Sequence, residues 1–160
     1  MSRYDWLLFL HVTSAFALIS AVVLASVLLV VARNRDVPSE VARLYGLTRL
    51  GDVLGGVGSI GALVFGIWLA IDVKGYELWD GWIIAAFVLW LVMGAFAGRA
   101  GKVINGTRNR ARALASEGAS DAPNAELRSL VRDPRGLWLQ AATALAVLLL
   151  LVDMIFKPGA

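Results

Sequence analysis

The chain has 160 residues, of which 59% are hydrophobic, and a formal net charge of +3. This apolar share exceeds that of an ordinary soluble domain and predicts a single domain, residues 1–160, that lies in a lipid bilayer. With no cysteine and one histidine, disulfides, thiolate metal sites, a protein-only zinc site and bis-histidine heme ligation within one chain are excluded. The positive charge suits loops that face anionic lipid headgroups, so no nucleic acid partner is expected.

Four segments are long enough, or nearly so, to cross a hydrocarbon layer that needs about 20 helical residues. They cover about residues 6–32, 53–73, 82–100 and 134–156. The first is far longer than the apolar part of a signal peptide, and its arginines follow it, so we expect it to remain as a helix. The predicted fold is all-α: an integral membrane bundle of four antiparallel helices with helical cytoplasmic extensions.

The segments between the spans carry helix signals of their own. Pro38 and Ser39 predict that the second helix begins near residue 39, before the membrane. In the cytoplasmic loop of about residues 101–133, the stretch GTRNRARALASEG predicts a basic continuation of the third helix, and GASDAPN predicts a break. Asp133 and Pro134 fit the cap and the first position of the last helix.

Basic residues set the expected orientation. Arg3, Lys74 and Lys157 lie on one side of the predicted bundle, and the other twelve of the fifteen lysines and arginines lie on the opposite side. Cytoplasmic loops of membrane proteins are enriched in Lys and Arg. We therefore expect a multi-pass membrane protein with both termini outside the cytoplasm.

Small residues predict how the spans pack, because they let helix backbones approach closely. On the second span they recur every three or four residues, which is one helix face, and the third span adds two glycines. The predicted packing residues are Gly51, Gly55, Ser59, Ala62, Gly66, Gly94 and Gly98. We expect these stripes to pack within one chain, and a seam between copies in a homo-oligomer is the alternative.

The lone histidine is the main candidate for a binding site. His11 follows Trp6, a typical boundary residue, by five positions, which places it roughly 7–8 Å inside the outer leaflet. An ionisable side chain at that depth is costly unless it faces the bundle interior or water, which makes it a functional candidate. The alternative is structural: a neutral imidazole that hydrogen-bonds a neighbouring helix.

Other polar or aromatic side chains lie near the same level. Asp153 lies about one turn inside the outer end of the last span. We expect a local ion pair between Asp153 and Lys157, four residues apart, or alternatively a contact between Asp153 and His11. The candidates for binding a ligand or cation are His11, Ser14, Trp68, Asp72, Asp153 and Lys157. No catalytic residue and no metal site is assigned.

Three stretches carry a resemblance to a known family: LLFLHVTSAFALISAVVL, ARLYGLTRLGDVLGGVGSIGALVFGIWLA and VDMIFKPGA. Together they resemble the bacterial predicted integral membrane proteins of domain-of-unknown-function family 2269, and this resemblance implies a place in the bacterial inner membrane. More distantly, the chain is similar to HemJ-type protoporphyrinogen oxidases and CopD-type copper-resistance membrane domains. The first of these implies a heme-associated redox site, with heme b held by His11, and the second implies copper handling.

The leading expectation is a noncatalytic membrane protein that binds a small ligand or cation at an outer-leaflet site around His11. Two alternatives stay open. One is a heme- or quinone-linked membrane oxidoreductase that uses His11, and the other is a structural subunit of a membrane assembly.

Overall fold

The computed structural model describes residues 2–72, 77–119 and 122–158, and within these ranges it is helical without strands. The helices are α1 (Arg3–Ala32), α2 (Pro38–Gly46), α3 (Thr48–Asp72), α4 (Gly81–Leu114), the short π-helical segment η1 (Ala115–Ala119), α5 (Ala125–Arg132) and α6 (Pro134–Phe156). Four helical stretches are long and apolar enough to cross a membrane. The predicted all-α membrane fold is confirmed.

Polar caps fix where the first and last helices begin. Ser2 and Asp5 form a capping box, in which the Ser2 Oγ accepts from the Asp5 N–H and the Asp5 Oδ2 accepts from the Ser2 N–H. At the start of α6, the Asp133 Oδ1 accepts from the Arg135 N–H at 2.9 Å, and Pro134 takes the first helical position as predicted.

The segments between the spans differ from the prediction in two places. The second helix is interrupted, because α2 ends at Gly46 and α3 begins at Thr48, whose hydroxyl donates to the Tyr45 carbonyl at 2.8 Å. The region predicted as a loop after α4 contains a further helix, α5, which the Asn124 side chain caps. The basic continuation of α4 is present and ends near Gly118, which has a φ of 91°. Residues 120 and 121 of the predicted break lie outside the described residues.

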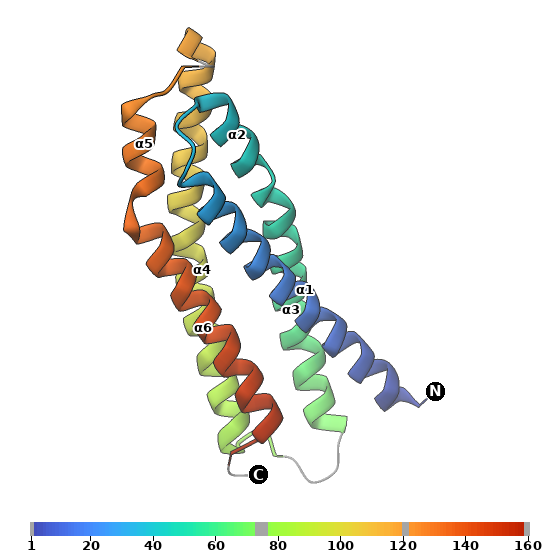
Figure 1. Cartoon of the computed structure of the whole chain (residues 1–160). Coiled ribbons are helices and arrows are strands. Elements are labelled where there is room, and N and C mark those ends of the chain that lie inside the picture. The colour runs from blue at the N-terminus through green and yellow to red at the C-terminus, as the bar shows by residue number, and fades with distance from the viewer. Residues whose placement is uncertain (1, 73–76, 120–121, 159–160) are drawn as a thin grey trace.

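The membrane helices form two antiparallel pairs (Figure 1). One pair is α1 with α3, and the other is α4 with α6. The pairs lie together at the end of the molecule that holds α2 and α5, and they diverge toward the end that holds both chain termini. We call these the head end and the open end.

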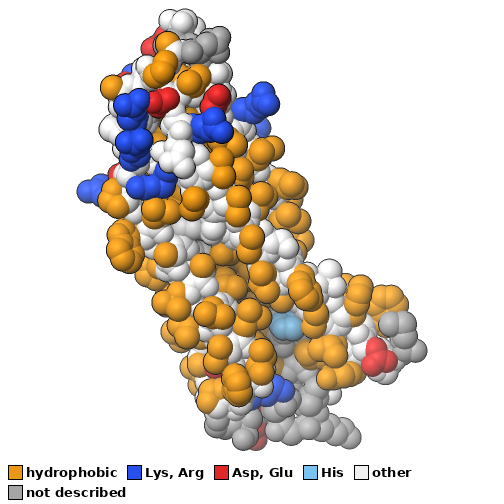
Figure 2. Space-filling model, in the orientation of Figure 1, with side chains coloured by type: hydrophobic (Ala, Val, Ile, Leu, Met, Phe, Trp, Pro, Cys, Tyr) orange, Lys and Arg blue, Asp and Glu red, His pale blue; other side chains and the backbone are white. Residues whose placement is uncertain are grey.

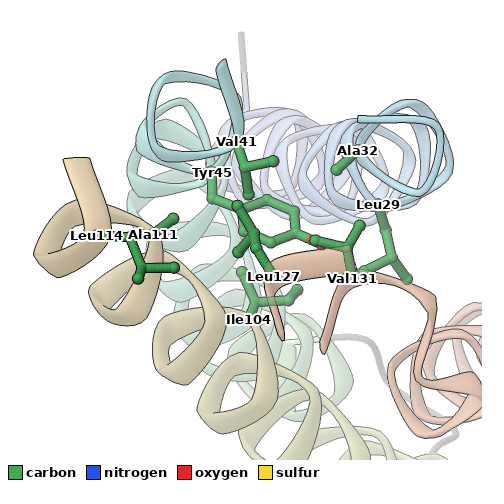
Figure 3. Packing of buried hydrophobic residues seen from close by; sticks show 9 residues of the cluster. All are labelled: Leu29, Ala32, Val41, Tyr45, Ile104, Ala111, Leu114, Leu127 and Val131. Carbon is green, nitrogen blue, oxygen red and sulfur yellow. The ribbon is translucent and has the colours of Figure 1, made fainter. Parts of the chain in front are cut away.

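A separate hydrophobic core lies at the head end (Figure 3). It is built from α1, α2, α4 and α5 and consists of Leu29, Ala32, Val41, Tyr45, Ile104, Ala111, Leu114, Leu127 and Val131. Charged pairs cover it: Arg110 holds Glu126 with two hydrogen bonds of 2.7 and 2.8 Å, and Arg128 pairs with Asp36. An apolar core with a charged surface is the pattern of a water-facing unit. The head therefore joins the two helix pairs through packing that does not need lipid.

Candidate functional site

The seam between α1 and α3 depends on glycines of α3. A Cβ at Gly58 would lie 2.5 Å from the Leu18 backbone nitrogen, and one at Gly66 would lie 3.0 Å from the His11 Cε1. The distance at Gly58 is shorter than real Cβ contacts, so only glycine allows α1 to approach this closely there, and the distance at Gly66 is tighter than nine in ten such contacts. The imidazole of His11 therefore packs directly against the α3 backbone.

The predicted packing residues divide between this seam and other places. Gly51 and Gly55 face Ala21, and Gly66 faces His11. Gly94 and Gly98 are exposed on α4, where an added Cβ would meet no atom within 4 Å. The prediction missed Gly58 and Gly61, both of which face α1. They lie on the same helix as the predicted stripe but on its other edge, and an alternative three-residue step from Gly55 would have found Gly58.

One ring nitrogen of His11 forms a hydrogen bond between α1 and α3. Its Nδ1 lies 3.0 Å from the Ala62 carbonyl oxygen on α3. Because a carbonyl oxygen only accepts, Nδ1 carries the hydrogen in this contact. In the neutral ring, Nε2 then keeps its lone pair and acts as an acceptor or a Lewis base.

His11 lies on the face of α1 that packs against α3, where its ring contacts Ala62 and Gly66. Val22 lies eleven residues on, about three turns toward the head end. At Val22 α1 contacts α6, where the Gln140 Nε2 donates to the Val22 carbonyl and to the Ser26 hydroxyl at 3.0 Å each. His11 lies about 16 Å nearer the open end, where the pairs have diverged. Its ring is part-buried, and the chain's only imidazole, pale blue in Figure 2, is visible at the surface. We call the surroundings of this ring the recess.

Aromatic side chains bound the recess on the head side. The Trp90 indole on α4 donates to the Ser59 hydroxyl on α3 at 2.9 Å and so bridges the two pairs. Phe87 stacks on Trp90 with ring centroids 6.2 Å apart. Ser59 precedes Ala62 by about one helical turn, so this bridge lies one turn from the carbonyl that anchors His11. Trp90 and Ser59 are part of the site's surroundings, and neither was a predicted ligand-binding residue.

Three of the predicted candidates serve the α1–α3 pair itself. The Ser14 hydroxyl donates to the Leu10 carbonyl of its own helix at 2.7 Å. Asp72 pairs with Arg3 at 2.9 Å, and the guanidinium of Arg3 also lies 5.8 Å from the centre of the Trp68 ring. Trp68 and Asp72 thus tie the open ends of α1 and α3 together at the rim.

The last two candidates lie on the other pair. Lys157 ends α6 in a left-handed conformation, with a φ of 42°, and its Nζ lies 5.5 Å above the Trp82 ring of α4. Asp153 is 6% exposed, and its Oδ2 has no hydrogen-bond partner. That oxygen forms neither the predicted local pair with Lys157 nor the alternative contact with His11.

Few side chains near His11 could bind a metal ion or a polar ligand. In the described part of the chain, no three His, Cys, Asp or Glu side chains gather in a group that could hold a metal ion. The acid nearest the rim on α3, Asp72, is already neutralised by Arg3. The imidazole of His11 is the remaining side chain at this level with a lone pair that the Ala62 hydrogen bond does not use.

Comparison with known proteins identifies one family whose profile covers nearly the whole chain. Residues 5–158 match the profile of a family described as predicted integral membrane protein, DUF2269. No curated protein and no solved structure matches the chain.

Proposed function

Because the chain belongs to the DUF2269 family of predicted integral membrane proteins, we propose that it acts within the bilayer by binding a small ligand in the recess beside His11. The observation that carries this proposal is the hydrogen bond of 3.0 Å between Nδ1 and the Ala62 carbonyl. It supports the proposal because it fixes the tautomer and leaves the Nε2 lone pair unused by that bond.

The chemistry of the recess indicates the class of ligand. An Nε2 lone pair binds an O–H or N–H donor, and the surrounding side chains of α1, α3 and α4 are mostly apolar. A molecule with an apolar body and a hydroxyl group, such as a phenol or a quinol, meets both conditions. A bare cation is supported less well, because a single nitrogen gives it too few ligands.

Heme b is a second candidate, since one accessible imidazole nitrogen is what a single axial iron bond requires. His11 would hold the iron, and Phe87 and Trp90 would offer apolar contacts to the porphyrin. Bound heme would supply one-electron redox chemistry. The chain itself would orient the group through the Ala62 hydrogen bond and keep water from it.

Two variants of His11 separate a binding role from a structural one. In His11→Asn, the amide N–H replaces the Nδ1 donor to Ala62, but no group replaces Nε2. In His11→Ala, both are lost. We expect the Asn variant to keep the melting temperature of the native protein in detergent and to lose the co-purifying ligand, read by native mass spectrometry and by the visible spectrum.

The spectrum distinguishes the two candidates. A Soret band that disappears in His11→Asn supports heme, whereas a colourless protein that retains an organic molecule only with native His11 supports the hydroxyl ligand. If His11→Asn retains every bound molecule that the native protein retains, and only His11→Ala lowers the melting temperature, His11 is a packing residue and the structural-subunit alternative holds.

A further inference from the structure

A groove at the head end lies far from His11 in the sequence and serves no step of the proposed function. It has a volume of about 490 Å³ and is lined by Val31, Arg35, Ser39, Glu40, Arg43, Leu44 and Leu47. That volume falls within the range of small-ligand sites, about 300–1,000 Å³. The lining comes from the end of α1, the loop after it, α2 and the residue that joins α2 to α3.

The groove lies at the boundary between apolar and charged surface. The apolar run of α1 ends at Ala32, and that of α3 begins at Val53. Val31 lies beside the first point, and Leu47 lies six residues before the second; they are 40% and 54% exposed. Arg35 lies beyond the boundary on the head side. In Figure 2, basic and acidic side chains gather over the head end, and a broad apolar belt begins directly below them. One half of the groove therefore faces acyl chains, and the other half faces headgroups.

The charges of the groove favour an anion. The Arg35 Nη1 lies 3.3 Å from the Glu40 Oε2, so the only acid of the lining is compensated. Arg43 is exposed and takes part in none of the ion pairs formed within the described ranges. The groove thus carries one uncompensated positive charge. It also contains the first turn of α2, whose N-cap residue Val37 gives no side-chain cap, and a helix N-terminus attracts negative charge.

We propose that this groove binds the phosphate headgroup of an anionic phospholipid, with Arg43 and Arg35 on the phosphate and an acyl chain along Val31 and Leu47. A lipid is favoured over free phosphate because the groove continues into exposed apolar surface. Leu50, one turn of chain beyond Leu47, is 60% exposed and extends that surface toward the membrane. A free phosphate would use only the charged half.

The test measures lipid retention by native mass spectrometry of the full chain in detergent, with phosphatidylglycerol or phosphatidylcholine added. We expect the native protein to retain phosphatidylglycerol preferentially. Arg43→Gln should lower that retention about fivefold, which corresponds to the ~1 kcal/mol that a basic residue contributes beside an anionic lipid. The matched control is Arg132→Gln, which removes the same charge from an exposed position of α5 that does not line the groove.

A second variant distinguishes lipid from free phosphate. Leu47→Gln should lower the retention of phosphatidylglycerol without changing the binding of glycerol phosphate. The proposal is overturned if Arg43→Gln and Arg132→Gln lower the retention of phosphatidylglycerol equally, because the lipid is then attracted by the overall positive charge and not by the groove. It is also overturned if glycerol phosphate displaces the lipid as well as added phosphatidylglycerol does, since the acyl contact then contributes nothing.

Discussion

The carboxyl group of Asp153 has an unusual environment for an acid in a membrane helix. The residue is 6% exposed, and its Oδ2 has no hydrogen-bond partner. A buried charge without a partner costs several kcal/mol, whereas a neutral polar group in the same place costs less. A negative charge on Asp153 therefore has a cost in this environment, because one of its two carboxylate oxygens is buried without a partner.

This environment predicts that Asp153→Asn stabilises the protein. We expect the free energy of unfolding to rise by about 1–2 kcal/mol at neutral pH, because the amide removes the charge at nearly constant volume. Thermal unfolding in detergent measures it. Asp72→Asn is the matched control at the same end, and it should lose about 0.5–1 kcal/mol with its ion pair to Arg3. A larger loss in Asp153→Asn than in Asp72→Asn would show that Asp153 has a partner.

At the scale of single residues, the hydrogen-bond and ion-pair partners could not be predicted from the sequence. The spacing from Trp6 predicts the level of His11, because helical rise is constant. Its hydrogen bond to Ala62 joins residues 51 positions apart in the sequence, and helical spacing carries no information about such a contact. The pairs Arg3–Asp72 and Lys157–Trp82 were missed for the same reason.

At the scale of elements, the glycine seam of α1 and α3 gives a direct prediction. In Gly58→Ala the new methyl would lie 2.5 Å from the Leu18 backbone nitrogen, and no side-chain rotation relieves that clash. We expect a loss of about 1–3 kcal/mol in the free energy of unfolding as α1 and α3 separate.

Gly56→Ala on the same helix is the control. A Cβ there meets nothing within 4 Å, so the better helix propensity of alanine should stabilise α3 by about 0.5–1 kcal/mol. Thermal unfolding of the two variants in one detergent compares them. Equal melting temperatures would mean that α1 does not approach α3 as closely as the structure shows.

Helix ends could be predicted because they depend on local chemistry, as at Pro38 and at Asp133 with Pro134. The pairing of the helices could not, since a helix that is apolar all round does not reveal which face meets lipid. The head core was missed for another reason. The stretch AELRSLVR was read as part of a loop, although Leu127 and Val131 lie on one helical face and both are buried. Its i,i+4 apolar spacing was the available signal.

At the scale of the whole molecule, the charge distribution predicts the orientation. The head end holds most of the arginines. Because the chain has no cysteine, a single introduced cysteine is the only thiol that a reagent can label. We expect Ser2→Cys to react with a membrane-impermeant thiol reagent in intact cells. Ser116→Cys, exposed at the head end, should react only after the membrane is opened. The opposite pattern would reverse the orientation and place His11 in the inner leaflet.

The divergence of the two helix pairs also affects the route by which the proposed ligand would reach His11. Because the two pairs diverge toward the open end (Figure 1) and His11 lies on a helix apolar enough to cross the membrane, a hydrophobic compound would arrive by diffusing within the membrane, not from the aqueous phase. Its occupancy would follow its mole fraction among the lipids. The apparent affinity measured against total added compound should therefore weaken in proportion as more lipid is supplied at fixed protein, even though the contact with the imidazole is unchanged.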